Sequence, residues 1–320
     1  MKLSFAALLS LAVLAPVLAA GPAFAYPVTV KSCNRDVTFA AAPKQAISND
    51  VNLTEMMLAL KLQGNMVGYT GISGWKTLDA QLREGVKELP ELSPKYPTKE
   101  VLLGADADFY FAGWNYGMTV GGEVTPDTLA VHKIAVYELT ESCIHIMKKA
   151  KPTMDDMFID LTNLGTIFGV DDRAKALVEG YKAELATILA KIDRTAASVR
   201  VFVYDSGEDQ PFTSGKFGIP TAMIEAAGGM NIVDDVEKSW TKISWEPVIE
   251  RNPEVVIIVN YGDVTAEQKI AFMKNNPAFK NIDAVKNDRF VVLQYVEATP
   301  GPRNVKAIER LARAFHPKAF

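Results

Sequence analysis

The sequence has few of the residues that build metal centres and active sites. Its 320 residues include two cysteines and three histidines, and His132, His145 and His316 show neither HxH nor HxxxH spacing. The CxH pair at Cys143 and His145 is not a metal-ligand set. PFTSGK lacks the GxxxxGK[ST] pattern of a phosphate loop, and there is no GxSxG nucleophile elbow. The pattern therefore favours neither an enzyme nor direct metal binding, and it predicts no cofactor.

Long apolar runs and blocks of like charge are also absent after the N-terminus. Acidic and basic residues alternate along the chain, and the formal net charge is −4. Without a basic stripe or tail, nucleic acid is not an expected partner. No segment after the N-terminus approaches the 18 apolar residues of a transmembrane helix.

The first 25 residues have the pattern of a signal peptide. Lys2 precedes an apolar run, and Ala23-Phe24-Ala25 matches the small-x-small site that signal peptidase recognises. A retained membrane helix is the alternative, which the interruption at Pro16 disfavours. No cysteine stands at the cleavage point, which argues against a lipid anchor. We expect export to the periplasm as a soluble, monomeric chain of two domains.

The two cysteines are expected to form a disulfide, because export places them in an oxidising compartment. Cys33 and Cys143 would close a loop of about 110 residues, which stabilises by roughly 4–5 kcal/mol in the chain-entropy model. Both lie in the first half of the chain, so the bridge would tie that half alone. Two free thiols at a redox or metal site are the alternative.

A repeat in the sequence indicates two similar lobes. Glu100 opens EVLLGADADFYFA and Glu246 opens EPVIERNPEVVIIV, each read as a short helix, an Asn/Asp/Pro turn and a buried strand. Upstream, TEMMLALKLQGNMVG and TAMIEAAGGMNIVDD repeat a helix, a glycine-containing turn and a strand. Two lobes imply a cleft, and a cleft favours ligand capture.

Strands and helices alternate in both halves, which predicts an α/β fold with parallel sheets. The predicted strands are 46–48, 66–69, 109–111, 134–139, 199–204, 255–259 and 290–293, with helices at 53–60 and 302–315. The expected division is residues 26–152 for an N-terminal lobe, 153–197 for a helical segment and 198–320 for a C-terminal lobe. The long loop after the strand at 199–204 is expected to line the cleft.

The helical segment contains the expected connection between the lobes. Residues 154–168 have one apolar face, and a second helix with continuous helical spacing runs from Asp171 to Arg194. Asp171 or Asp172 is expected to cap it. At 1.5 Å per residue this helix is roughly 35 Å long, about the width of a small domain.

In several segments the chain resembles the periplasmic substrate-binding proteins of ABC importers for cobalamin, ferric siderophores and haem. The specific pieces are PFTSGKFGIP, AAGGMNIVDDV, ISWEPVIERNPEVVII and the strand after Pro43 leading to LTEMMLALKL. The resemblance implies a class III fold, in which two Rossmann-like lobes are bridged by one long α-helix. Such proteins close less on ligand binding than carriers hinged by strands.

The resemblance also implies a partner, the dimeric inner-membrane ABC permease with its ATPase. In that family each lobe presents one glutamate to arginines of the permease, and Glu100 and Glu246 match those positions. A spaced pair of carboxylates can orient the carrier on a two-fold partner. The alternative is that each acid only complements a helix N-terminus.

Residues that follow the predicted strands are the candidates for the cleft, and they mix aromatic with charged side chains. These candidates are Asn49, Asp50, Trp75, Trp114, Tyr116, Glu141, Asp205, Phe212, Lys216, Trp240, Tyr261 and Arg303. Packing beneath a loop is the alternative for each aromatic. For Arg303 the alternatives are capping of the last helix or an ion pair with Glu297.

The mixture of basic and aromatic candidates favours a ferric siderophore, with iron enclosed in an organic chelator. Cobalamin and haem are the alternatives, and Tyr116 or Tyr261 is a candidate axial ligand for haem. A sensor module that passes ligand to a signalling partner would use the same fold.

Overall fold

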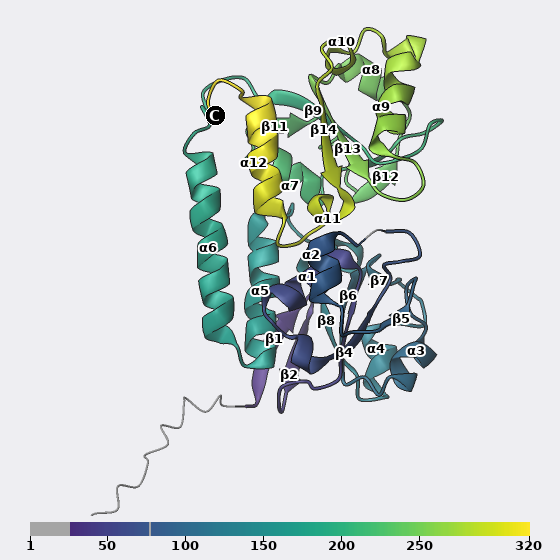
Figure 1. Ribbon diagram of the computed structural model, residues 1–320, viewed down its shortest axis with the longest axis vertical. Helices are drawn as coiled ribbons and strands as arrows, with labels where there is room; N and C mark the ends of the chain where they lie inside the picture. Colours follow the sequence, from purple (N-terminus) through teal and green to yellow (C-terminus); the bar gives the residue numbers. More distant parts are fainter. Residues whose placement is uncertain (1–25, 77) are drawn as a thin grey trace, which may run out of the picture.

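The computed structural model describes residues 26–76 and 78–320, so the predicted signal peptide lies outside the described residues. These residues form two α/β lobes, one above the other in Figure 1. The helices α5 (Met154–Phe168), α6 (Asp171–Leu189) and α12 (Asn304–Phe315) lie along one side of them. The predicted α/β architecture of two lobes is confirmed.

The N-terminal lobe is built on a parallel sheet in the order β5-β4-β3-β6-β7, with β8 also paired to β6. Its strands are β3 (Ala46–Asn49), β4 (Met66–Thr70), β5 (Glu91–Ser93), β6 (Phe109–Trp114), β7 (Gly117–Met118) and β8 (Ala135–Glu138). Its helices are α1 (Val51–Ala59), α2 (Ala80–Gly85), α3 (Lys99–Gly104) and α4 (Pro126–Ala130), with 3₁₀ turns at Gln63–Asn65 and Thr140–His145.

An antiparallel hairpin, β1 (Val28–Ser32) and β2 (Arg35–Phe39), precedes this sheet. Cys33, in the turn of the hairpin, is bonded to Cys143 in the 3₁₀ turn after β8. The predicted disulfide is therefore present in the structure, and it ties the hairpin to the end of the same lobe.

The C-terminal lobe has a four-stranded parallel sheet in the order β11-β9-β13-β14. Its strands are β9 (Val199–Tyr204), β11 (Gly229–Asn231), β13 (Val255–Asn260) and β14 (Phe290–Gln294), and β10 (Phe212–Ser214) pairs with β12 (Trp240–Lys242). Its other helices are α7 (Ile219–Ala226), α8 (Glu246–Arg251), α9 (Ala266–Asn275), α10 (Asp283–Lys286) and α11 (Tyr295–Ala298), with a 3₁₀ turn at Pro277–Phe279. The first five residues of β13 are apolar and buried, as is typical where helices cover both faces of a parallel sheet.

The predicted repeat has the same backbone geometry in both lobes. Glu100 lies in the first turn of α3, and Glu246 in the first turn of α8. Six residues further on, Asp106 and Asn252 adopt positive φ angles of 51° and 45°. Asp and Asn tolerate this left-handed conformation better than most residues, so each copy turns sharply into its buried strand.

The connection between the lobes is α6, as predicted, but its ends differ from the prediction. The helix ends at Leu189 rather than Arg194, and Val170 is its N-cap residue, without a side-chain hydrogen bond. Asp171 and Asp172 lie in its first turn instead, where negative charge complements the helix dipole. The preceding helix α5 matches the predicted 154–168 and ends at Gly169, whose φ of 68° suits glycine. The residue numbers proposed as domain boundaries stay a prediction.

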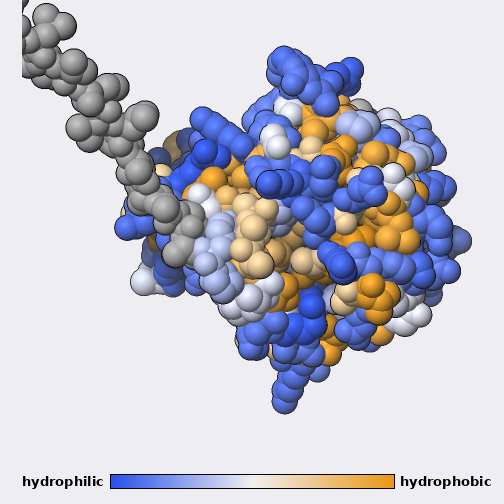
Figure 2. Space-filling view, turned by 90° about the horizontal axis from the view of Figure 1, so that it is seen from below, coloured by the Kyte–Doolittle hydropathy of each residue, from blue (hydrophilic) through white to orange (hydrophobic). Residues whose placement is uncertain are grey.

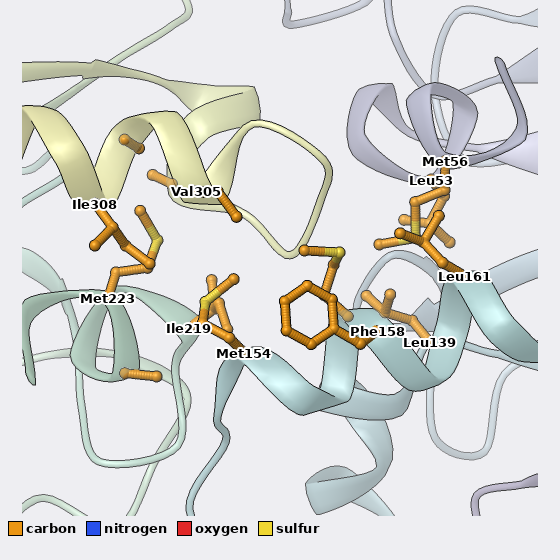
Figure 3. Packing of buried hydrophobic residues seen from close by; sticks show 14 of the residues in the cluster. Leu53, Met56, Leu139, Met154, Phe158, Leu161, Ile219, Met223, Val305 and Ile308 are labelled. Carbon is orange, nitrogen blue, oxygen red and sulfur yellow. The ribbon is translucent and has the colours of Figure 1, made fainter. Parts of the chain in front are cut away.

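A continuous apolar core joins the two lobes along these helices. Met154 of α5 lies beside Ile219 of α7, and Val305 and Ile308 of α12 face the same region (Figure 3). Further along α5, Phe158 and Leu161 are buried with residues of α1. The lobes are therefore linked by one chain connection and by packing, which limits how far they can move independently.

The surface at the end of the N-terminal lobe is mixed, with apolar patches interrupted by polar side chains (Figure 2). Within residues 26–76 and 78–320, no helix combines the length and the apolar character that a membrane span requires.

Candidate functional site

A cavity with a volume of ≈ 220 Å³ lies between the two lobes. The N-terminal lobe contributes Trp75, Lys76, Tyr96, Asn115, Tyr116 and His145. The C-terminal lobe contributes Asp205, Phe212, Ser239, Trp240, Val259, Tyr261, Tyr295, Ala298 and Thr299. Several of these residues stand at or just after the carboxyl ends of β9, β13 and β14, where ligands sit in open α/β sheets.

The structure brings half of the predicted cleft residues to this cavity. Those that line it are Trp75, Tyr116, Asp205, Phe212, Trp240 and Tyr261. Phe212 lies in the segment predicted as a long loop after β9, where it begins β10, and it lines the cleft as expected. Its ring stacks on Trp240 at 5.8 Å between centroids. Asn49 and Asp50 are fully buried, and Asp50 bonds directly to Lys76 and Tyr295 of the cavity wall.

Three predicted residues lie elsewhere, because other partners hold them. Trp114 packs inside the N-terminal lobe and donates from its Nε1 to Glu138 Oε1 at 2.8 Å. Lys216 is paired with Glu237 at 2.8 Å on the surface. These two side chains, with Arg303, do not line the cavity.

Arg303 bridges the lobes. Its Nε donates to Glu55 Oε1 at 2.8 Å, and its guanidinium also pairs with Asp79. It occupies the N-cap position of α12 without a side-chain capping bond, and Arg310 is the partner of Glu297. Of the two alternatives for Arg303, the ion pair with Glu297 is therefore wrong, while the residue does stand at the N-cap of the last helix.

On the N-terminal side of the cavity, Asp50, Lys76 and Tyr295 form a buried network. Asp50 caps α1 by accepting from the Val51 amide at 2.6 Å, and its Oδ2 accepts from Lys76 and, at 2.9 Å, from the Tyr295 hydroxyl. Lys76 Nζ lies 4.7 Å from the Trp75 ring centroid and 4.6 Å from that of Tyr295. Burial lowers the pKa of Lys76, and the charge of Asp50 opposes this effect.

On the C-terminal side, Asp205, Lys269 and Tyr261 form a second network of the same composition. Asp205 Oδ1 accepts from the Tyr261 hydroxyl at 2.8 Å and from Ser206 at 2.8 Å. Lys269 Nζ lies 5.1 Å from the Tyr261 ring centroid and donates to the Val259 carbonyl at 2.6 Å. Burial raises the pKa of Asp205, while its hydrogen bonds and the charge of Lys269 oppose the shift.

Glu141, another candidate, lies at the seam behind the cavity wall. Its Oε1 accepts from Ser239 Oγ at 3.2 Å and from the Ile219 amide at 3.3 Å, both in the other lobe. Among the residues that the structure describes, neither its buried Oε2 nor the buried hydroxyl of Tyr116 has a hydrogen-bond partner. Burial raises the pKa of Glu141 to about 8, so the carboxyl is mainly protonated at neutral pH.

Sequence reasoning missed several lining residues, and the signals for them differ. Lys76 directly follows the candidate Trp75 in the sequence. Tyr295 directly follows β14, so the rule that residues after a strand line the cleft also applied to it. The same rule applied to Asn115, which directly follows β6. Tyr96 and Ser239 lie in irregular segments and His145 ends a 3₁₀ turn, and none of these three has a comparable signal.

The chemistry of the cavity suits binding by aromatic faces rather than direct coordination of a bare metal. Within the described part of the chain, no cluster of three or more His, Cys, Asp or Glu side chains is placed to hold a metal ion. Burial holds the pKa of Tyr116 and of Tyr261 above the ordinary value. The hydroxyl of Tyr261 donates a hydrogen bond to Asp205 Oδ1 at 2.8 Å.

The two candidate docking residues are exposed. Glu100 and Glu246 both stand at the solvent-facing starts of short helices, and in Figure 1 α3 and α8 lie on the side away from α6. Glu100 also accepts local hydrogen bonds that lower its pKa.

Comparisons with known proteins agree with this architecture. Residues 50–296 match the family described as "Periplasmic binding protein". The chain is 22% identical to an uncharacterized ABC transporter substrate-binding lipoprotein, YvrC of Bacillus subtilis, over 92% of this chain and 87% of that protein. It is 25% identical to the cobalamin-binding protein of Halobacterium salinarum, over 92% and 75% of the two chains. A solved periplasmic binding protein from Veillonella parvula is 30% identical, with a TM-score of 0.78 over 91% of this chain and 97% of that chain.

Proposed function

Because the chain belongs to the periplasmic binding protein family, whose members are non-catalytic carriers of ABC transporters, we propose that it captures a ferric siderophore in the periplasm and delivers it to an ABC permease. The observation that carries this proposal is the ring of aromatic side chains around one interlobe cavity. The rings belong to Trp75, Tyr96, Tyr116, Phe212, Trp240, Tyr261 and Tyr295. Such rings give broad apolar contact to a chelate at low entropic cost.

The size of the cavity adds a condition to this proposal. Pockets for drug-sized ligands are usually about 300–1,000 Å³, larger than the ≈ 220 Å³ seen between the lobes. A whole siderophore therefore requires the lobes to separate, or part of the chelate to remain at the mouth. Trp75, with 38% of its surface exposed, stands where it can contact such a ligand.

Cobalamin is the second candidate. It is favoured by the alignment of 92% of this chain, at 25% identity, with a cobalamin-binding protein. Haem is a further alternative cargo, for which Tyr116 or Tyr261 of the cavity wall is the candidate axial ligand.

Tryptophan fluorescence tests the proposed cargo. Titration with ferric siderophores should quench the tryptophan fluorescence of the wild-type protein. The variants Trp75→Phe and Trp240→Phe should each show less quenching. Trp114→Phe is the matched control, because that indole is buried away from the cavity. If cyanocobalamin quenches the fluorescence and no iron chelate does, cobalamin becomes the proposed cargo in place of a ferric siderophore.

We also propose that Glu100 and Glu246 are the permease-docking residues, since both are exposed and occupy equivalent positions in the two lobes. The double substitution to Ala should leave chelate affinity unchanged and reduce ATP-driven uptake in reconstituted vesicles. Glu123→Ala together with Glu267→Ala removes the same charge elsewhere and serves as the control. Normal uptake by the Glu100/Glu246 variant would remove the docking role.

A further inference from the structure

Each lobe places one lysine and one aspartate at the cavity. The lysine lies nearer the cavity in one lobe, and the aspartate lies nearer it in the other. In the N-terminal lobe Lys76 lines the cavity and Asp50 lies behind it. In the C-terminal lobe Asp205 lines the cavity, and Lys269, which approaches it closely enough to affect its pKa, does not. One wall therefore presents the positive member of its set, and the opposite wall presents the negative member.

The wall residues keep hydrogen-bonding capacity for a ligand. A lysine ammonium has three N–H donors, and the acceptors of Lys76 among the described residues are Asp50 Oδ2 and the Gly71 carbonyl. The hydrogen bonds that Asp205 accepts in the described structure both end on Oδ1. Lys76 thus has a donor available, and Asp205 has Oδ2 available as an acceptor.

The remaining titratable groups near the cavity add little charge at neutral pH. Burial lowers the pKa of His145, helped by the charge of Lys238, so this imidazole is neutral. Burial raises the pKa of Glu141 to about 8, with Asp156 adding to the shift and Lys149 opposing it, so this carboxyl is mainly protonated. Lys76 and Lys269 then balance Asp50 and Asp205, so these two sets together carry no net charge.

We propose that this cavity is bipolar and selects a chelate of zero net charge, which presents an oxygen acceptor to Lys76 and an N–H or O–H donor to Asp205. A multiply anionic chelate would find one ammonium that Asp50 already neutralises, and a carboxylate on the opposite wall. Like charge brought against a buried carboxylate is unfavourable, and this repulsion provides the discrimination. The inference rests on the proposed function and names the charge class of its ligand.

The test compares ligands that differ in charge. Dissociation constants are measured for ferrichrome, an uncharged ferric trihydroxamate, and for ferric enterobactin, a trianionic tricatecholate. We expect ferrichrome to bind at least about tenfold more tightly. Asp205→Asn should shift this ratio toward the anionic chelate by about tenfold, and Lys76→Gln should shift it the other way.

Two controls and a second pair of probes keep the outcomes separate. Asp127→Asn and Lys133→Gln change the same charges on the exposed surface and should leave the ratio unchanged. Lys76→Gln leaves Asp50 buried without its cation, so Asp205→Asn decides the matter if that variant does not fold. Cyanocobalamin and a tricarboxylate obtained by hydrolysis of its amides provide the same charge contrast without a siderophore.

Each result then has one meaning. A preference for the uncharged member that Asp205→Asn weakens supports the inference. If Asp205→Asn changes the ratio of the two dissociation constants no more than Asp127→Asn does, the inference is overturned, even where iron chelates bind. Binding of the cobalamins alone, with the expected preference, rejects the iron-chelate cargo and keeps the inference. Failure of all four probes to bind overturns both.

Discussion

Each lobe places an aspartate directly after an interior strand of its sheet, Asp50 after β3 and Asp205 after β9. In both lobes the carboxylate accepts a tyrosine hydroxyl at 2.8–2.9 Å, and a lysine lies against the ring of that same tyrosine. The origin of the tyrosine differs. Tyr261 comes from the same lobe as Asp205, whereas Tyr295 reaches Asp50 from the opposite lobe.

This difference separates a local network from one that joins the lobes. The Asp205 network keeps its geometry whatever the relative position of the lobes, because its members belong to one sheet and its loops. The Asp50 network depends on the lobes being together, since Tyr295 supplies one of its hydrogen bonds. Two sites with the same residue types therefore differ in what they connect: the Asp205 network lies within one lobe, and the Asp50 network joins the two lobes.

The largest expected effect is on the stability of the N-terminal network. Asp50→Asn leaves the buried Lys76 without its anion, and removing one member of a buried ion pair costs about 3–5 kcal/mol. Asp205→Asn should cost less, about 1–3 kcal/mol, because Lys269 keeps the Val259 carbonyl as its acceptor. Urea unfolding of both variants measures the contrast. Equal losses would show that the two networks are energetically equivalent.

The next effect concerns Glu141, which lies where the two lobes meet. Its contribution to stability depends on pH. The pKa of Glu141 is about 8 in the folded protein and 4.5 for the ordinary side chain, so folding keeps a proton that the unfolded chain releases. Stability from this group is complete below pH 4.5 and is lost as the pH rises toward 8, at up to ~1.4 kcal/mol per pH unit.

Glu141→Gln removes this titration, so its stability relative to wild type should rise by ~2–4 kcal/mol between pH 5 and pH 8. Thermal unfolding at several pH values measures the difference, with the exposed Glu123→Gln as the control. A difference that stays constant with pH would contradict the buried, protonated state of Glu141.

The smallest expected effect separates the two tyrosines. Tyr295→Phe and Tyr261→Phe each remove one hydrogen bond to a carboxylate, worth about 1–3 kcal/mol. Only Tyr295→Phe removes a contact between the lobes, so it alone should raise the radius of gyration in small-angle X-ray scattering of the unliganded protein. The same radius for both variants would assign lobe closure to other contacts, such as the ion pairs of Arg303 with Glu55 and Asp79.

Most of the elements could be predicted from local patterns, because their signals are contained in short windows. The strand at 199–204 and the helix at 154–168 were predicted with the observed limits, and the repeat around Glu100 and Glu246 predicted two equivalent helix-turn-strand units. The end of α6 was placed too late, because apolar spacing continues to Ile192 after the helix has ended.

The site was less accessible to such reasoning. The rule that ligands lie beyond strand ends selects loops but not the direction of a side chain. Trp114 satisfies the rule and yet points to Glu138, because successive residues of a strand face opposite sides of the sheet. Arg303 and Lys216 also lie in loops after predicted strands, but Arg303 forms ion pairs with Glu55 and Asp79, and Lys216 forms one with Glu237.

By itself the sequence determined the α/β class, the two lobes, the connecting helix and the residues that pair as a disulfide. These depend on periodicity, repetition and residue type, all of which are local in the chain. Only the tertiary structure decided which charges meet at the cavity. Asp50 and Tyr295 are 245 positions apart, and their contact depends on how the lobes pack, which no window of sequence contains.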